Sequence, residues 1–396
     1  MLSSGRMPEG SGLPDPAPQS PTTSQRLRLV GLDLEYINDY RQEFSRNAAL
    51  YRALAGRLDV VGRMSPVLTR GQMLVNRMRQ FHPHVPSWRR NTHFNPQLFE
   101  QRTEISGQYL NARRGQYDVI LQTYLQFAPA PQPPGRPYGL YLDATYEMSR
   151  RHYPEDHPLS ARATAHWLRL ERATYQGAAR MFTWSDFTAR SLIEDYGCDP
   201  ARVVRVGAGT NLMAPSLAEK RYDSQVALFV GIDFGRKGGH DVLQAFREVR
   251  QQMPEAELWI VGPRLPKAAP QPGVRWLGRI QDRARLSALY RHAQLFVMPS
   301  FEPWGHVFCE AMGHGLPCIA LSVGPASEIV QAEQTGLQVE RGSPQALAGA
   351  LLRLLGDPAL AERMGRQAYA EVQQRFTWDL VADRLLPHLE AMAQGE

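Results

Sequence analysis

One stretch decides the fold: Leu295-Phe-Val-Met-Pro-Ser-Phe-Glu302-Pro-Trp-Gly305-His-Val-Phe-Cys-Glu310-Ala-Met-Gly-His-Gly-Leu-Pro317. Its apolar start, 295–298, ends at Pro-Ser and predicts a buried strand that runs into a loop. Gly305 frees the backbone where a helix can begin, and Glu310 falls within that helix. The stretch therefore predicts a strand, a loop that carries Glu302, and a helix.

The junction between this strand and this helix suits a phosphate, because helix N-termini offer free N–H groups and a partial positive charge. We expect the amides of Gly305, His306 and Val307 to contribute. Glu302 and Glu310 lie eight positions apart and can accept hydrogen bonds from hydroxyls on either side of the phosphate. A nucleotide-sugar has this order of groups. The alternative is an ordinary strand, turn and helix with exposed glutamates.

The rest of the chain repeats the alternation of strands and helices in two series. Strands are predicted at 27–32, 58–61, 119–122, 138–142, 181–184 and 203–206, and then at 227–230, 258–261, 274–277, 295–298, 318–321 and 337–339. Helices of the second series are predicted at 239–252, 282–292, 306–313, 326–333 and 344–355. Such alternation indicates an α/β protein with two parallel sheets, whose ligands bind at the carboxyl ends of the strands.

The two series set the predicted domain boundaries. Residues 1–25, rich in Pro, Gly and Ser, are expected to be a disordered leader, followed by a first Rossmann-like domain at 26–206. A second Rossmann-like domain is expected at 207–376, and 377–396 should form a C-terminal amphipathic helix.

Composition places the chain among water-soluble globular proteins. Of its 396 residues, 43% are hydrophobic and 21% charged, and no apolar run approaches the ~20 residues of a membrane helix. Cys198, Cys309 and Cys318 are an odd number without metal-type spacing, so we expect buried thiols in the cytoplasm.

Basic residues are mostly arginine, since lysine occurs only at Lys220, Lys237 and Lys267 among the 45 basic residues. Between Arg41 and Arg114 there are 13 Arg and four acids, an excess of +9. This excess could steer an anionic acceptor or hold the protein peripherally on an acidic membrane face. A solvated basic surface is the alternative. No nucleic-acid partner is expected, because no binding module is recognisable.

A second loop, Gly231-Ile-Asp-Phe-Gly-Arg236-Lys237-Gly-Gly239, follows the predicted strand at 227–230. Its glycines let the backbone approach a ligand. Arg236 and Lys237 could neutralise the charge on a departing nucleoside diphosphate without a metal ion. The alternative is a surface turn with two solvated cations.

The stretch at 299–317 resembles the E-x7-E signature of retaining glycosyltransferases of family 4. That family shows Pro-Ser-x-x-Glu, then Gly, Glu-Ala-Met and Gly-x-Pro, and here Trp304 replaces the usual Phe. The resemblance implies the GT-B fold, in which two Rossmann-like domains face each other across a cleft and a C-terminal helix crosses back to the first. It also implies transfer of a sugar from a nucleoside-diphosphate-sugar to a glycan, lipid-linked or small-molecule acceptor, with no cofactor and no metal.

The resemblance also implies roles for residues. Glu310 would bind the ribose and Glu302 the donor sugar, while Lys237 and Arg236 would hold the diphosphate. Three further donor-binding positions at strand ends follow from it: Gly231, Gly262 and Ile280.

Asp143 follows the predicted strand at 138–142 and matches a family position with a catalytic or acceptor-binding role. The alternative is that it caps the next helix.

The chain departs from the family in three places. Ile232 stands where an Arg is usual and Leu142 where a His is usual, which leaves open a catalytically weak or inactive subunit that binds nucleotide-sugar as a partner protein. Gly31-Leu-Asp33-Leu-Glu35 replaces a Gly-Gly loop. We expect a turn with solvated carboxylates there. Contacts to acceptor hydroxyls and an imitation of a metal-binding Asp-x-Asp motif are the alternatives.

Overall fold

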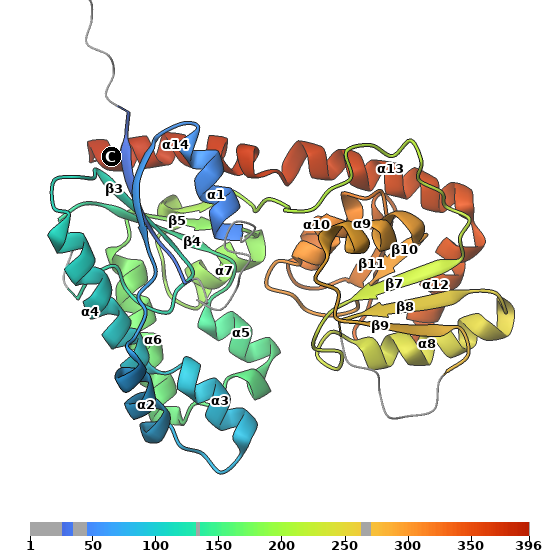
Figure 1. Cartoon of the computed structure of the whole chain (residues 1–396), viewed down its shortest axis with the longest axis horizontal. Helices are drawn as coiled ribbons and strands as arrows, with labels where there is room; N and C mark the ends of the chain where they lie inside the picture. The colour runs from blue at the N-terminus through green and yellow to red at the C-terminus, as the bar shows by residue number, and fades with distance from the viewer. Residues whose placement is uncertain (1–25, 35–45, 132–134, 263–270, 396) are drawn as a thin grey trace, which may run out of the picture.

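A computed structural model describes residues 26–34, 46–131, 135–262 and 271–395, so the predicted leader and Glu35 lie outside the described residues. The chain forms two six-stranded parallel sheets, which lie side by side along the long axis (Figure 1). The order of the first is β2-β1-β3-β4-β5-β6. Its strands are β1 (Arg28–Leu32), β2 (Asp59–Met64), β3 (Val119–Thr123), β4 (Tyr138–Leu142), β5 (Arg180–Thr183) and β6 (Val203–Arg205).

The second sheet has the order β12-β11-β10-β7-β8-β9. Its central strands are almost wholly apolar because helices cover both faces of a parallel sheet. Every residue of β10 and β11 is buried. The strands are β7 (Val226–Val230), β8 (Glu257–Val261), β9 (Val274–Gly278), β10 (Leu295–Val297), β11 (Cys318–Leu321) and β12 (Gly336–Val339).

Helices cover both sheets. The first domain has α1 (Arg46–Ala55), α2 (Arg70–Arg79), α3 (Val85–His93), α4 (Pro96–Ala112), α5 (Tyr146–His152), α6 (Ala161–Gly177), α7 (Asp186–Glu194) and the 3-10 turns η2 (Pro154–Asp156) and η3 (Pro200–Arg202). The second series continues with α8 (Gly239–Gln252), α9 (Arg283–His292), α10 (His306–Met312), α11 (Ala326–Ile329), α12 (Pro344–Gly356), α13 (Pro358–Arg375) and α14 (Trp378–Gln394).

Two helices differ from the sequence prediction. The helix predicted at 326–333 ends at Ile329, because the backbone is already extended at Val330, and the chain then turns through Glu333, whose φ is 62°, to enter β12. The helix α13 was not predicted at all. The side chain of Asp357 caps it by accepting from the amide of Leu360 at 2.9 Å.

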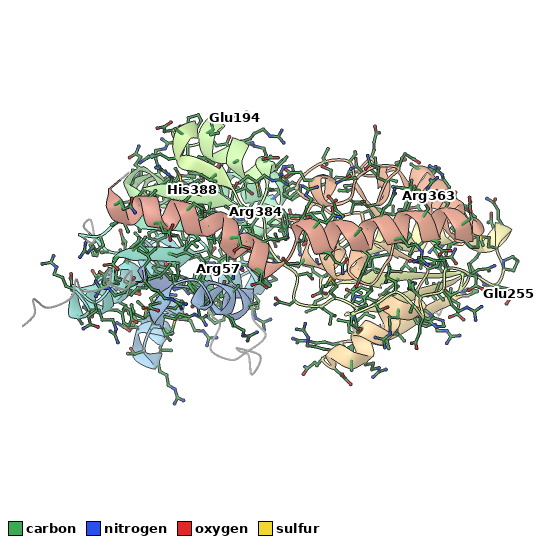
Figure 2. All side chains as sticks on the ribbon, turned by 90° about the horizontal axis from the view of Figure 1, so that it is seen from above. Arg57, Glu194, Glu255, Arg363, Arg384 and His388 are labelled. Carbon is green, nitrogen blue, oxygen red and sulfur yellow. The ribbon has the colours of Figure 1, made fainter. Side chains whose placement is uncertain are left out.

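The last two helices run across both domains (Figures 1 and 2). α14 packs on α1, where Arg57 pairs with Asp379 at 3.1 Å and Asp383 at 2.6 Å. Arg384 donates to the carbonyl oxygen of Val206 at 2.9 Å, which ties α14 to the end of β6. Figure 2 shows Arg57 beside α14. The C-terminal helix thus lies against the first domain.

The domains also meet through Glu328 of α11. Its carboxylate accepts hydrogen bonds from the amides of Asp186 at 2.9 Å and Phe187 at 2.8 Å, the first residues of α7. A carboxylate at a helix N-terminus satisfies free N–H groups and complements the helix dipole. The second domain therefore supplies an N-terminal cap to a helix of the first.

The prediction of solvated carboxylates after β1 is wrong for Asp33. This side chain is buried, pairs with Arg63 at 2.6 Å and accepts from the hydroxyl of Ser65. Both partners come from β2 and the residue after it, which the sequence alone does not bring near. Within the described ranges, no three side chains of His, Cys, Asp or Glu gather as a metal site requires. No helix there is long and apolar enough to span a bilayer.

Candidate active site

Glycines allow the loop after β7 to pack closely on the loop after β10. Gly238 has φ 74°, and a Cβ there would lie 2.5 Å from the carbonyl oxygen of Pro299. A Cβ on Gly231 would lie 2.3 Å from Cδ of Lys237. Gly262, at φ 121°, approaches the carbonyl of Gly231 just as closely, at 2.3 Å. These close approaches leave no space for a side chain at any of the three glycines.

Two cations and one carboxylate meet at this junction. Nζ of Lys237 lies 3.0 Å from Oε1 of Glu302, and the guanidinium of Arg236 lies 3.4 Å from the same atom. The hydroxyl of Ser300 donates to Glu302 at 3.1 Å. The side chains of Lys237 and Glu302 are only 13% and 11% exposed. The alternative of a surface turn with two solvated cations is therefore wrong.

The first domain reaches into this cluster through Tyr153. The guanidinium of Arg236 lies 5.0 Å from the centre of the Tyr153 ring, whose hydroxyl donates to the carbonyl of Phe301. Burial, followed by the negative charge of Glu302, raises the pKa of Tyr153 to about 12. Burial alone would lower the pKa of Arg236, but the charge of Glu302 and smaller contributions from Tyr153 and Asp233 together outweigh it, so the net shift is upward. Arg236 therefore stays cationic.

Glu310 lies on α10, which Gly305 begins with φ 98°. The carboxylate is half-buried and accepts a hydrogen bond from the hydroxyl of Tyr290 on α9 at 3.3 Å. Tyr290 is fully buried, and burial raises its pKa well above the ordinary value, so it remains a donor. This hydrogen bond fixes the side chain of Glu310 beside α9.

His306 and Val307 open α10 and are half-buried. The ring of His306 lies 5.0 Å from Trp184 of the first domain, centre to centre. Trp184 in turn lies 6.1 Å from Tyr124, which follows β3 and has φ 63°. A positive φ is rare for a tyrosine and occurs where the surrounding structure requires it. An aromatic series thus connects α10 with the first domain.

The remaining predicted donor residues lie at strand ends. Ile280 follows β9, is half-buried and packs against the core of the second domain. The amide of Gly262 donates to the carbonyl of Gly278 at 2.8 Å, so the ends of β8 and β9 are held together. Ile232 is 65% exposed, whereas Arg236 points to Glu302.

Asp143 follows β4 and is half-buried. Its carbonyl oxygen accepts from the hydroxyl of Thr188 at 2.7 Å. The alternative that it caps the next helix is wrong, because Thr145 caps α5 by accepting from the amide of Met148. The cluster around Glu302 lies in the second domain and Asp143 in the first.

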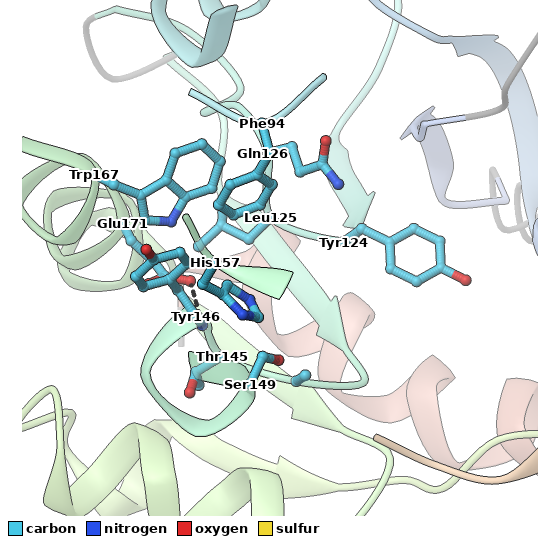
Figure 3. Close-up of a pocket in the computed structure, with 11 residues that line it drawn as sticks. Phe94, Tyr124, Leu125, Gln126, Thr145, Tyr146, Ser149, His157, Trp167 and Glu171 are labelled. Carbon is cyan, nitrogen blue, oxygen red and sulfur yellow. Dashed lines mark hydrogen bonds between the residues drawn. The ribbon is translucent and has the colours of Figure 1, made fainter. Parts of the chain in front are cut away.

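A pocket of about 100 Å³ opens in the first domain, and its lining begins at Ala144, the residue after Asp143 (Figure 3). Its walls are mainly aromatic. The ring of Phe94 stacks on those of Trp167 and Tyr146, with ring centres 3.8 Å and 5.4 Å apart. Glu171 lies at its inner side, where it accepts from the amide of Tyr146 at 3.1 Å. The complete lining is Phe94, Tyr124, Leu125, Gln126, Ala144, Thr145, Tyr146, Ser149, His157, Trp167 and Glu171.

Sequence reasoning missed this pocket and also Ser300, Tyr153 and Trp184. The Pro-Ser element held a signal for Ser300, which sits two residues before Glu302. No local signal marks Tyr153 or Trp184, because they reach the second domain only through the contact between domains.

This geometry places a cationic loop at the strand ends of the second of two Rossmann-like domains. Residues 224–357, which make up most of the second domain, match the family model described as glycosyl transferases group 1. Curated relatives include a D-inositol 3-phosphate glycosyltransferase of Kineococcus radiotolerans, which is 32% identical over 54% of this chain and 58% of its own length. A phosphatidyl-myo-inositol mannosyltransferase of Mycobacterium leprae is 30% identical over 53% of this chain and 58% of its own length. The chain thus matches little more than half the length of either relative.

Solved structures support the fold over most of the chain. A sucrose-phosphate synthase from Thermosynechococcus elongatus superposes with a TM-score of 0.68 at 19% identity, over 94% of this chain and all of that one. The Anabaena protein HepE, solved in complex with UDP, superposes with a TM-score of 0.62 at 17% identity, over 92% of this chain and all of that one. At these identities the likeness shows the GT-B fold.

Proposed function

We propose that the chain is a retaining glycosyltransferase that moves a sugar from a nucleoside-diphosphate-sugar to an acceptor without a metal ion. The observation that carries the proposal is the convergence of Lys237 and Arg236 on Glu302 at the ends of β7 and β10. Largely buried cations at the carboxyl ends of parallel strands lie where open α/β sheets bind ligands.

A bound donor would replace part of these contacts. Its diphosphate would neutralise Lys237 and Arg236, beside the N-terminus of α8, which no side chain caps within the described part of the chain. Glu302 would then be free to accept hydrogen bonds from the donor sugar. Glu310 would bind the ribose, and the amides of Gly305 to Val307 would add donors to the diphosphate.

Three strand ends would shape the rest of the donor site. Gly231 and Gly262 would let the backbone approach the donor, and Ile280 would lie beside the base.

The chemical step would follow from stabilisation of the leaving group. The bond between the anomeric carbon and the diphosphate oxygen breaks, and the electron pair leaves with the diphosphate. Lys237 and Arg236 would stabilise that developing charge, the largest single contribution in many enzymes. The acceptor hydroxyl attacks from the face that the diphosphate leaves, and its proton passes to a diphosphate oxygen. Configuration at the anomeric carbon is then retained.

The acceptor would bind in the aromatic pocket of the first domain. Sugar-like rings pack on aromatic faces, and Gln126 and Ser149 supply hydrogen-bonding groups around them. Asp143 directly precedes Ala144 and Thr145 of the pocket lining and would contact the reacting hydroxyl. Two relatives bear names of phosphorylated inositols, which are hydroxyl-rich rings of this kind.

Incubation with UDP-glucose, UDP-N-acetylglucosamine and GDP-mannose, with measurement of released nucleoside diphosphate, tests the proposal. Turnover that survives a chelator and gives the donor's own anomeric configuration by NMR is expected. Glu310→Gln should abolish turnover and leave the fold intact, and wild-type rates in this variant would contradict the assignment. Nucleotide binding without turnover, in the presence of acceptor extracts, would instead support the partner-subunit alternative that Ile232 and Leu142 leave open.

A further inference from the structure

An exposed surface on α2, α3 and the segment between them carries apolar and basic side chains together. Its apolar members are Leu74, Met78 and Phe81, and its basic members are Arg70, Arg77, Arg79 and Arg89. We call these residues the α2–α3 tip. Figure 1 shows α2 and α3 at the end of the first domain opposite α14.

Apolar exposure is concentrated at this place. Ten large apolar side chains are exposed in the described part of the chain, and seven of them lie between Val61 and Val85. Leu74 is 59%, Met78 62% and Phe81 71% exposed. Scattered exposed apolar residues need no explanation, but a cluster marks a surface that another body covers.

α2 turns a polar face to the core and an apolar face to the solvent, which is the reverse of the usual arrangement. Its only buried residue is Asn76, which donates to the carbonyl of Thr92 at 2.6 Å and accepts from Asn95 at 3.2 Å. A surface helix of a globular protein normally turns its apolar face to the core. Here polar hydrogen bonds hold the inner face of α2, and Leu74 and Met78 point away from the core.

Arginines carry all of the formal charge in the segment that contains α2 and α3. From Val60 to Phe99 there are six arginines and no Asp or Glu. Two of the six are paired, Arg63 with Asp33 and Arg90 with Asp156. The other four are exposed, and within the described residues none of the four makes an ion pair: Arg70, Arg77, Arg79 and Arg89.

We propose that the α2–α3 tip docks on the surface of an anionic lipid bilayer. Apolar side chains enter the boundary between headgroups and acyl chains, while arginines beside them contact lipid phosphates. Charge complementarity alone would also suit a nucleic acid or an acidic protein. Exposed Leu74, Met78 and Phe81 favour the bilayer, because a phosphate backbone offers these side chains nothing to enter.

Docking would bring the aromatic pocket to the membrane surface. Phe94 directly follows α3 and lines the pocket, and Arg90 of α3 bonds to the carbonyl of Glu155 at 2.9 Å in η2. The pocket is therefore built partly from the end of the docking element. If docking is combined with the proposed function, the acceptor is a lipid-carried molecule. Only this conclusion about the acceptor rests on the proposed function.

Sedimentation with vesicles tests the docking directly on the full chain. Vesicles of phosphatidylcholine alone are compared with vesicles that also contain phosphatidylglycerol. We expect binding to the anionic vesicles only, reduced by added salt. Arg77→Gln/Arg79→Gln should weaken it about 30-fold, since each basic residue near such a surface contributes about fivefold. The matched control is Arg247→Gln/Arg363→Gln, exposed arginines of the second domain, which should bind as the wild type does.

A second measurement tests whether apolar side chains enter the lipid. All three native cysteines are buried, so Met78→Cys can be labelled selectively with an environment-sensitive dye. A blue shift on anionic vesicles is expected from this position. Arg247→Cys, labelled in the same way, should show none. Leu74→Ser/Met78→Ser should lower vesicle binding by about tenfold or more and leave the free energy of unfolding unchanged, because both side chains are exposed.

Several results would overturn the proposal. One is the absence of binding to anionic vesicles. Another is vesicle binding that is as strong in the arginine and apolar double variants of the α2–α3 tip as in the wild type. A third is binding that depends on the arginines alone, with no shift of the dye at position 78 and equal affinity for duplex DNA. That result would identify a general polyanion surface instead.

Discussion

Replacement of Lys237 by Met tests the charge cluster while keeping the shape of the side chain. The ammonium group lies 3.0 Å from Glu302, and Arg236 lies 3.4 Å from the same oxygen. Lys237→Met removes one positive charge and leaves the other in place. Effects on stability and on turnover should therefore separate.

The expected loss of stability is small. At 3.0 Å the attraction between Lys237 and Glu302 is about 5–6 kcal/mol with an effective dielectric constant of ~20. Most of this is offset by the cost of burying both charges, and breaking a buried pair costs about 3–5 kcal/mol only when a charge is left alone. Since Arg236 still faces Glu302, we expect the free energy of unfolding to fall by about 1–2 kcal/mol.

The expected loss of activity is large. Removing one donor from a site that stabilises developing negative charge lowers kcat by about 10²–10³-fold. Steady-state release of nucleoside diphosphate at saturating donor measures kcat, and urea unfolding measures stability on the same preparation.

Lys220→Met is the matched control. This lysine is also buried, which lowers its pKa to about 7, but it donates to carbonyl oxygens of Arg221 and Arg291 rather than to the cluster. Its loss should lower stability and leave kcat unchanged. A wild-type kcat in Lys237→Met, or an equal fall of kcat in Lys220→Met, would refute the reasoning.

Two further substitutions test the backbone and the titration of the second domain. Gly238→Ala should lower the free energy of unfolding by about 2–4 kcal/mol, measured by urea unfolding, because φ is 74° and the new Cβ meets Pro299; an unchanged midpoint would contradict this. Burial lowers the pKa of His314 to about 4 from 6.5, so its contribution to stability is complete above pH 6.5 and is lost as the pH falls toward 4. His314→Gln should remove this acid-dependent loss of stability. Between pH 6.5 and 4 the free energy of unfolding of the wild type should therefore fall by about 3 kcal/mol relative to that of the variant. Parallel pH profiles of the two proteins would disprove the prediction.

Much of the fold follows from local patterns. Each of the twelve predicted strands corresponds to a strand of the structure, because alternating apolar runs and turn residues mark parallel α/β units locally. α13 also had a local signal that was overlooked, Asp357 followed by Pro358, the usual start of a helix.

The candidate site was only partly predictable. Lys237, Arg236 and Glu302 lie in two loops whose strands, β7 and β10, are neighbours in the sheet, so topology brings them together. Asp33 was misjudged because its partners come from another strand. Tyr153 could not be found because its contact crosses between domains, which no spacing within the chain encodes.

The most direct test of the central claim is a crystal structure with a non-transferable UDP- or GDP-sugar bound. We predict the diphosphate within hydrogen-bond distance of Lys237 and Arg236, with Glu302 turned from the cations to the sugar and Glu310 on the ribose. A donor bound in another place, or bound with the contact between Lys237 and Glu302 intact, would contradict the account.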